Sequence, residues 1–200
     1  MENFEQLVKQ RQSCRDYLEQ PVEKEKLLRL AEVGRLTPSA CNSQPWKMYF
    51  VSGQKAKEVA PCLQDMGMNK FTSKAPTFIV ITETGATLKP GANRKFSSDH
   101  FVKYDVGQLV AYLTLEAKEL GLDTCIIGWV NGEKLRAAVG YPETELCNLV
   151  IALGYSQAPL REKARNPLET VASFMELKGK ESKPLRFKQK DRFTVKFLKR

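Results

Sequence analysis

The sequence of 200 residues has a single histidine, His100, and this scarcity excludes several kinds of site. Zinc sites with two histidines, the H-E-x-x-H motif and most iron sites need more imidazole ligands than the chain contains. No C-x-x-C pair occurs among the cysteines, and neither G-x-x-x-x-G-K-[ST] nor G-x-G-x-x-G is present. We therefore expect no metal site, an exposed loop or helix-cap role for His100, and any nucleotide-like cofactor to be bound in another way.

Long apolar segments are also missing, because no run approaches the roughly 20 residues that span a bilayer. The first six residues lack the basic and then apolar pattern of a secretory signal. The five cysteines are odd in number and scattered, which favours a reducing compartment over a disulfide framework. We expect a cytoplasmic protein with no membrane contact.

The net charge of +9 is concentrated at the C-terminal end. Residues 176–200 contain ten Lys and Arg residues against three acidic ones, whereas residues 1–175 contain 22 basic and 20 acidic residues. Residues 192–197 alternate basic or polar with apolar side chains at the period of a strand. We predict a domain over 1–175 and a basic arm over 176–200 that packs on a partner subunit. The alternatives are a solvated tail or a nucleic-acid contact through the phenylalanines of this arm.

Hydrophobic periodicity predicts helices interspersed with strands. The helices are expected in the opening segment before Arg11 and at residues 24–36, 54–66, 101–120 and 133–139, and the strands at residues 48–51, 77–82, 124–130 and 146–155. Because the two types do not alternate strictly, an α+β fold with a mixed sheet flanked by helices is favoured over a doubly wound fold. The 101–120 helix is apolar around most of its circumference, so either a second subunit or its own chain buries it. Residues 85–96 are expected to form an exposed loop that could act as a lid.

Two arginines flank a serine after the first helix, at Arg11, Ser13 and Arg15. On a helical turn, this spacing would place both guanidinium groups on one side with the hydroxyl between them. Guanidinium binds phosphate oxygens bidentately and stays charged, so the segment is a candidate phosphate clamp. The alternative is a solvated helix end.

A second, more specific motif is the loop P-S-A-C-N-S-Q-P-W at residues 38–46. Its prolines restrict the backbone, its small residues allow close approach to a flat ligand, and Asn42 and Gln44 each offer a donor and an acceptor. Such a loop suits a planar heterocycle with an imide edge, although the amides could instead satisfy the loop backbone. Cys14 and Cys41 lie inside the two motifs, and we expect both to be small buried hydrophobic residues rather than redox groups.

Taken together, these motifs resemble the nitroreductase family of flavin mononucleotide (FMN) enzymes. R-x-S-x-R and P-S-A-x-N-x-Q-P-W occur in the order of the family. They are followed by D-V-G at 105–107, G-L-D-T-C-I-I-G-W at 121–129, V-I-A-L-G-Y at 150–155 and K-A-R-N-P-L-E at 163–169. The resemblance covers about residues 5–172 and implies an α+β fold and a homodimer with two FMN sites at its interface.

The resemblance also implies which residues bind the cofactor. Arg11 and Ser13 would contact the phosphate, Arg15 the phosphate or the pyrimidine edge, and the 38–44 loop would approach from the other subunit. Gly128 matches a glycine whose backbone lies near flavin N5, and Ile127 stands where several relatives have an acidic residue, so only backbone contact is inferred there. The expected set is Arg11, Gln12, Ser13, Arg15, Pro38, Ser39, Ala40, Asn42, Gln44, Ile127, Gly128, Lys163 and Arg165.

The function that this resemblance implies is an oxidoreductase that transfers hydride from NADH or NADPH through flavin N5 to an electron-poor acceptor in ping-pong fashion. Nitroaromatics and quinones are the expected acceptors, and no protein side chain is expected to act as a catalytic acid or nucleophile because the flavin carries the redox chemistry. The phosphate carries about −1.5 to −2 charges near pH 7, which several cations would have to balance. The alternatives are a flavin-binding or redox-sensing module without turnover, flavin fragmentation and reductive dehalogenation.

Overall fold

The computed structural model describes residues 4–87, 97–175 and 188–189, and its chain divides into two units between Ala158 and Pro159. The first unit contains a four-stranded sheet, β1 (Trp46–Ser52), β2 (Thr77–Glu83), β3 (Asp123–Ile127) and β4 (Leu146–Gly154). The strand order is β1-β2-β4-β3, and all three neighbouring pairs are antiparallel. A parallel bridge between Ser13 and Thr124 lies on the outer side of β3. The α+β class is confirmed, and this bridge supplies the parallel element of the first unit.

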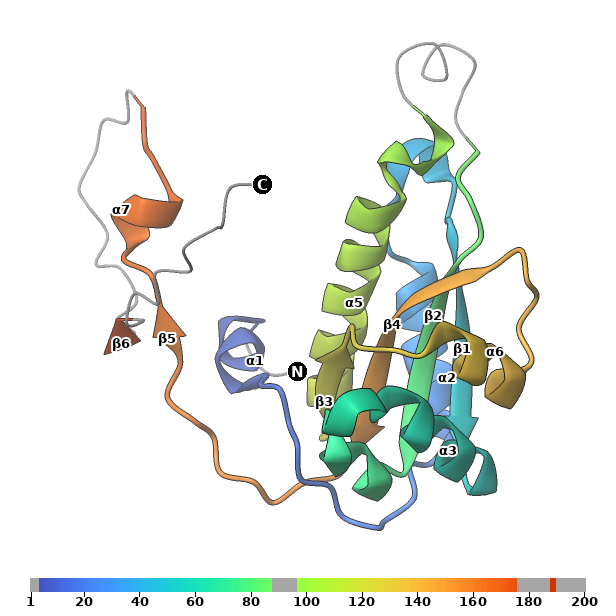
Figure 1. The fold of residues 1–200 in the computed structure, drawn as a ribbon. Helices are drawn as coiled ribbons and strands as arrows, with labels where there is room; N and C mark the ends of the chain where they lie inside the picture. The colour runs from blue at the N-terminus through green and yellow to red at the C-terminus, as the bar shows by residue number, and fades with distance from the viewer. Residues whose placement is uncertain (1–3, 88–96, 176–187, 190–200) are drawn as a thin grey trace. The chain divides into compact units, whose positions relative to one another are not determined.

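Among the described residues of the first unit, helices pack on both faces of the sheet (Figure 1). The helices of this unit are α1 (Phe4–Gln10), α2 (Lys24–Arg35), α3 (Gln54–Val59), α5 (Val102–Glu119) and α6 (Gly132–Val139). Helix α1 lies beside α5. Side chains alternate across β2, so Phe78 and Val80 pack on the α3 and α6 side while Ile79 and Ile81 pack on the α2 and α5 side. The unbroken apolar run of β2 is therefore buried on both faces of the sheet.

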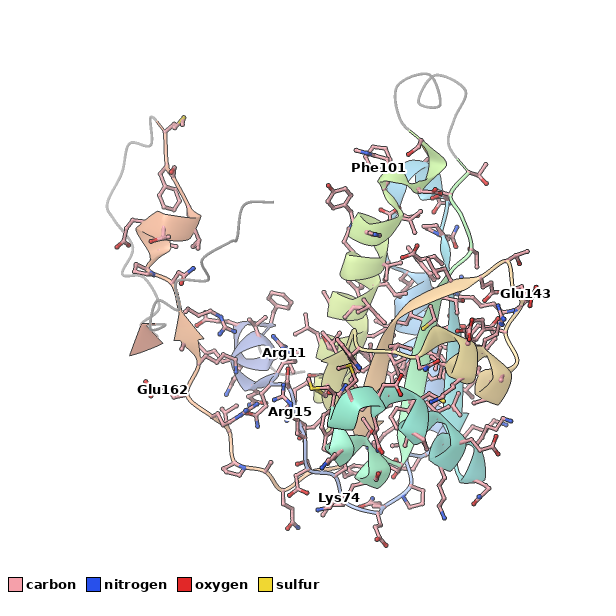
Figure 2. All side chains as sticks on the ribbon, in the orientation of Figure 1. Arg11, Arg15, Lys74, Phe101, Glu143 and Glu162 are labelled. Carbon is pink, nitrogen blue, oxygen red and sulfur yellow. The ribbon has the colours of Figure 1, made fainter. Side chains whose placement is uncertain are left out.

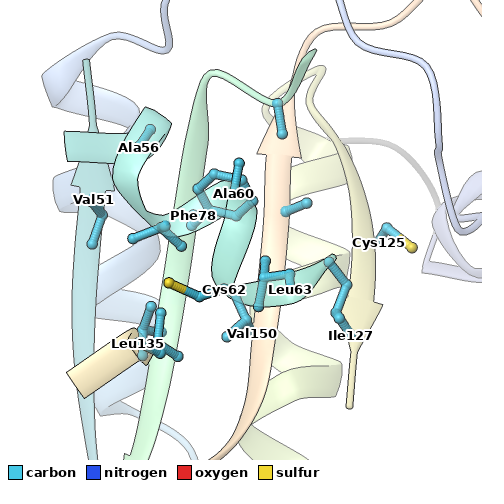
Figure 3. Packing of buried hydrophobic residues seen from close by; sticks show 14 of the residues in the cluster. Val51, Ala56, Ala60, Cys62, Leu63, Phe78, Cys125, Ile127, Leu135 and Val150 are labelled. Atoms are coloured by element: carbon cyan, nitrogen blue, oxygen red, sulfur yellow. The ribbon is translucent and has the colours of Figure 1, made fainter. Parts of the chain in front are cut away.

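The first of these cores includes Val51, Leu63, Phe78, Ile127, Leu135 and Val150 (Figure 3). The second is built around the long helix α5, whose Leu109 and Leu113 pack with Leu30 of α2. The chain of this subunit therefore buries one face of α5, but Tyr104 and Tyr112 on the same helix remain 66% and 42% exposed.

Helix ends follow the signals in the sequence. Gly121 follows α5 with a φ of 75° and Gly140 follows α6 with a φ of 85°, both in the left-handed region that favours glycine. The side chain of Asn131 caps α6 by accepting a hydrogen bond of 3.1 Å from the backbone N–H of Lys134.

The helix expected over residues 54–66 is wrong beyond Val59. There the chain turns through short 3-10 segments at Ala60–Leu63, Asp65–Gly67 and Lys70–Lys74. Pro61 has no N–H to continue an α-helical ladder, and Met66 and Asn69 adopt left-handed backbone angles, with φ of 56° and 50°. These turns bring residues 70–74 next to the N-terminal segment.

Two glycines allow close approach between elements. A Cβ on Gly34 would lie 2.8 Å from Sδ of Met48, and a Cβ on Gly154 would lie 2.7 Å from the ring of Pro76. Alanine at either position would force neighbouring atoms apart.

The second unit contains β5 (Ala164–Arg165), α7 (Leu168–Val171) and β6 (Lys188–Gln189), with β5 and β6 paired in parallel. The strand pattern at 192–197 and residues 88–96 of the expected lid lie outside the described residues. The domain boundary after residue 175 stays a prediction. Within the described ranges, no helix is both long and apolar enough to cross a membrane. No cluster of three or more His, Cys, Asp and Glu side chains suited to a metal ion occurs among those residues either.

Candidate functional site

Residues 11–15 run beside β3 rather than forming a helical turn. Ser13 bridges Thr124, and the backbone N–H of Cys14 donates to the carbonyl of Thr124 at 2.8 Å. The expected helical spacing of the two arginines is therefore wrong, because the outer side of β3 offers this segment a strand partner. In extended backbone alternate residues share a side, so Ser13 and Arg15 face away from Cys14, which is 2% exposed in the core. Arg11 stands where α1 ends, because its backbone N–H donates to the carbonyl of Leu7 at 2.8 Å.

A buried tyrosine anchors this segment. The hydroxyl of Tyr17 lies 3.1 Å from the carbonyl oxygen of Cys14 and 3.2 Å from that of Ala152 on β4. Burial raises the pKa of Tyr17 above its usual range, so the hydroxyl stays protonated and can donate. The backbone that carries the two arginines is therefore fixed to the central sheet.

The positive charges of the segment are available to an anion. Neither Arg11 nor Arg15 forms an ion pair with a carboxylate among the described residues. Arg15 instead lies over the ring of Phe71 at 5.9 Å, and Lys74 pairs with Asp16 at 3.1 Å. Figure 2 labels Arg15 and Lys74. Sequence reasoning missed residues 70–74 here, because nothing local in the sequence shows that the turns after α3 return to this segment.

The loop at 38–44 is exposed and has an unusual backbone. Cys41, Asn42 and Gln44 have positive φ angles of 55°, 54° and 47°, and all three are exposed. Left-handed conformations cost non-glycine residues about 1 kcal/mol or more each, and they persist where surrounding contacts impose them. The expectation that Cys41 is buried is wrong, because its left-handed backbone lies in a loop that projects into solvent. For Cys14, burial is confirmed.

Hydrogen bonds hold this loop in its shape. The backbone N–H of Gln44 donates to Oγ of Ser39 at 2.9 Å, and Nε2 of Gln44 lies 3.3 Å from Oδ1 of Asn42. The backbone N–H of Ala40 donates to the carboxylate of Asp105 on α5, with 3.2 Å to each oxygen. The side chains of Ser39 and Gln44 are thus engaged within the loop. The side chain of Asn42 accepts from Gln44 through its oxygen, and Asn42 is exposed at the surface.

The two motifs lie toward different ends of α5 within one chain. Ala40 is bound to Asp105 in the first turn of the helix, and Ser13 bridges Thr124 just after the helix has ended. The backbone N–H of Leu122 donates to the carbonyl of Ala117, so β3 begins beside the last turns of α5. Asp105 and Ala117 are twelve residues apart, which is about 18 Å along a helix.

Gly128 follows the end of β3 and is exposed, while Ile127 is 3% exposed. The side chain of Ile127 packs in the core with Leu63 and Val150 (Figure 3), so this position can offer a ligand only its backbone. Asn131 holds the following segment, because its side chain donates to Asp65 at 2.8 Å. That hydrogen bond, followed by the charge of Lys134, lowers the pKa of the Asp65 carboxyl.

The other two expected cations belong to the second unit. Lys163 precedes β5, and Arg165 lies in it with its guanidinium donating to the carbonyl of Ala164 at 2.8 Å. Their part in a phosphate site stays a prediction, as does that of Gln12, which is half-buried between the two arginines of the first motif.

The sheet and the helices on its faces define an α+β protein. A family model described as the nitroreductase family matches residues 8–66 and 63–155. The chain therefore belongs to the nitroreductase family.

Individual relatives extend over most of the chain. YodC of Bacillus subtilis, named provisionally as an NAD(P)H nitroreductase, is 25% identical over 202 residues, which are 88% of this chain and all of the relative. The structure of an FMN-dependent nitroreductase from Clostridium difficile has a TM-score of 0.67 and 25% identity, covering 86% of this chain and 98% of that one. An iodotyrosine deiodinase of Daphnia pulex is 23% identical over 197 residues, which are 85% of this chain and 65% of the relative.

The residues present fit an FMN molecule. Two guanidinium groups that pair with no carboxylate of the described ranges, on a segment fixed to the sheet, match a phosphate. The exposed amide of Asn42 could form hydrogen bonds with the edge of a planar ring. The exposed Gly128 after β3 allows such a ring to approach the backbone closely.

Proposed function

We propose that this nitroreductase-family chain is an FMN-dependent oxidoreductase that passes electrons from NADH or NADPH to an electron-poor small molecule. The observation that carries the proposal is the pair Arg11 and Arg15, two cations on a segment anchored beside β3 that have no carboxylate partner among the described residues. The relative from Clostridium difficile, FMN-dependent by name, supports the choice of ligand.

In this proposal the residues of the site bind or orient the cofactor. Arg11, Ser13 and Arg15 hold the phosphate, with Lys163 and Arg165 completing the cationic set. The FMN, when bound, supplies the hydride-accepting centre of the reaction. The backbone at Gly128 lies against the ring, and no side chain at Ile127 reaches it, because that side chain is in the core.

The loop at 38–44 acts on the ring from the partner subunit. The roughly 18 Å between the helix positions to which the two motifs are attached supports this, because one ring system then contacts the loop of one chain and the arginines of the other. The exposed Tyr104 and Tyr112 on α5 suit a homodimer interface beside the same loop. We further propose that the basic arm 176–200 packs on the partner and that the protein acts in the cytoplasm.

The acceptor is proposed to be a nitroaromatic or a quinone. Reduction of a quinone balances as NAD(P)H plus a proton and the quinone giving NAD(P)+ and the hydroquinone. Donor and acceptor occupy the same space in turn, so steady-state kinetics follow a ping-pong pattern.

Turnover tests this function directly. The FMN-loaded protein is mixed with NADH or NADPH and with menadione or a nitroaromatic, and oxidation of the nicotinamide is followed by absorbance. The proposal predicts parallel double-reciprocal lines for at least one nicotinamide. Bound FMN that neither nicotinamide reduces would support a redox-sensing module instead.

A second candidate is reductive dehalogenation, which the similarity to the Daphnia pulex iodotyrosine deiodinase favours. Iodide release from iodotyrosine, measured with the FMN-loaded protein under a strong chemical reductant, tests it. Iodide release without nitroaromatic or quinone turnover would favour this candidate over the first.

A further inference from the structure

Asp105 is a buried carboxylate at the start of the long helix α5. Its side chain belongs to a residue that is only 3% exposed, and both of its oxygens lie 3.2 Å from the backbone N–H of Ala40. Burying a charge is costly unless it is paired or hydrogen-bonded, and a position in the first turn of a helix offsets part of that cost. An apolar residue at position 105 could not accept this hydrogen bond, so the carboxylate has a role beyond filling space in the core.

The partner of this carboxylate is the loop with the strained backbone. The other hydrogen bonds of residues 38–44 are local, such as those between Gln44 and Ser39 and between Asn42 and Ser39. Within the described parts of the chain, the bond from Ala40 to Asp105 is the one that joins this loop to an element distant in the sequence. Ala40 immediately precedes Cys41 and Asn42, both left-handed.

We propose that Asp105 is a positioning residue of the FMN site, which fixes the 38–44 loop in its strained shape before the ligand binds. This inference rests on the proposed function. The backbone N–H of Ala40, just before the left-handed residues, donates a charge-assisted hydrogen bond to Asp105, and this bond keeps the backbone from relaxing. A second hydrogen bond, from the backbone N–H of Gln44 to Oγ of Ser39, joins the two ends of the same turn. The exposed amide of Asn42 is thereby presented in a constant orientation, so less conformational entropy is lost when a ring binds.

Three substitutions test the role of the hydrogen bond between Ala40 and Asp105, which is called the tether below. Asp105→Ala removes the acceptor, Asp105→Asn keeps one neutral acceptor, and Glu116→Gln is the matched control, a carboxylate-to-amide change on the same helix where the side chain pairs with Arg29 at 2.8 Å. FMN and riboflavin affinities are measured by flavin fluorescence on apoprotein, and residue-resolved hydrogen exchange is measured on the same apoprotein without any flavin.

If the tether holds the loop, the loss of flavin affinity should be graded across the three variants. In Asp105→Ala the Kd for FMN rises about tenfold, equivalent to about 1.4 kcal/mol at 25 °C. The Kd for riboflavin rises by the same factor, because the loop acts on the ring and not on the phosphate. Asp105→Asn gives an intermediate increase, the Ala40 amide exchanges at least tenfold faster in Asp105→Ala, and Glu116→Gln changes neither quantity.

Two results would overturn the inference. A lower melting temperature of Asp105→Ala with unchanged flavin affinity would show a purely structural role, and unchanged exchange at Ala40 would show that the tether does not hold the loop. If Asp105→Ala does not fold, Asp105→Asn takes its place, with faster exchange at the Ala40 amide and weaker binding of both flavins expected. A wild-type protein that binds no FMN contradicts the proposed function, and the exchange data alone then decide whether Asp105 holds the loop.

Discussion

Replacing Arg11 or Arg15 by alanine should weaken the binding of FMN and leave the binding of riboflavin almost unchanged. The two ligands share the ring and differ in the phosphate, which brings about −1.5 to −2 charges near pH 7. Both arginines lie on the segment that runs beside β3 and have no carboxylate partner in the described part of the chain. Their charge is therefore free to act on the phosphate.

The size of the effect follows from their surroundings. A hydrogen bond to a charged group contributes about 1.5–3 kcal/mol, or about 10- to 100-fold in Kd. Arg11 is half-buried and should fall in the upper part of this range, whereas solvent screens the exposed Arg15 and reduces its effect to about tenfold. The contact of Arg15 with Phe71 orients the guanidinium without neutralising it.

The assay is a fluorescence titration of apoprotein with FMN and with riboflavin at two salt concentrations. Arg35→Ala is the matched control, because Arg35 is an exposed arginine that pairs with Glu32 on α2 at 2.7 Å. We expect the ratio of the two Kd values to move toward one in Arg11→Ala and Arg15→Ala, and higher salt to weaken only FMN binding by the wild type. Equal losses for both flavins, or no loss for either, would refute the phosphate assignment.

Three further predictions concern the body of the fold. Folded apoprotein without flavin should show one fast-reacting thiol, Cys41, because the other four cysteines are buried; Cys41→Ser should abolish this phase, and several fast thiols would contradict the structure. Gly154→Ala should destabilise the protein by about 1–3 kcal/mol in urea unfolding, since its Cβ would lie 2.7 Å from the ring of Pro76, whereas Gly132→Ala meets no neighbouring atom and should cost far less. The pKa of Asp65 is lowered by the hydrogen bond from the cap of α6 and then by a lysine charge. Its contribution to stability should therefore be constant above about pH 5 and disappear as the pH falls through the lowered value. A stability difference between wild type and Asp65→Asn that grows below pH 4 would contradict this sign.

Much of the fold could be predicted because its signals are local. The apolar run of β2 indicates a central strand, and Gly121, Asn131 and Gly140 mark helix ends through backbone and capping preferences that need no tertiary partner. The helix predicted past Val59 fails because Pro61 and the left-handed residues after it outweigh the apolar periodicity.

The candidate site was predicted less completely because its geometry depends on partners distant in the sequence. The strand-like course of Arg11 to Arg15 is imposed by Thr124, more than a hundred residues away. The approach of Phe71 to Arg15 and the tether from Asp105 to Ala40 also join distant segments, and no spacing in the sequence encodes either contact. The residue types of the candidate site could be proposed from the sequence, but the contacts between them are known only from the structure.

The central claim is that this chain binds FMN which a reduced nicotinamide can reduce. An anaerobic absorbance spectrum of the FMN-loaded protein, taken before and after one equivalent of NADH or NADPH, tests it most directly. We predict a flavin spectrum that stays with the protein on a desalting column and loses its long-wavelength band after at least one nicotinamide. A protein that retains no flavin, or a bound flavin that neither nicotinamide bleaches, would contradict the claim.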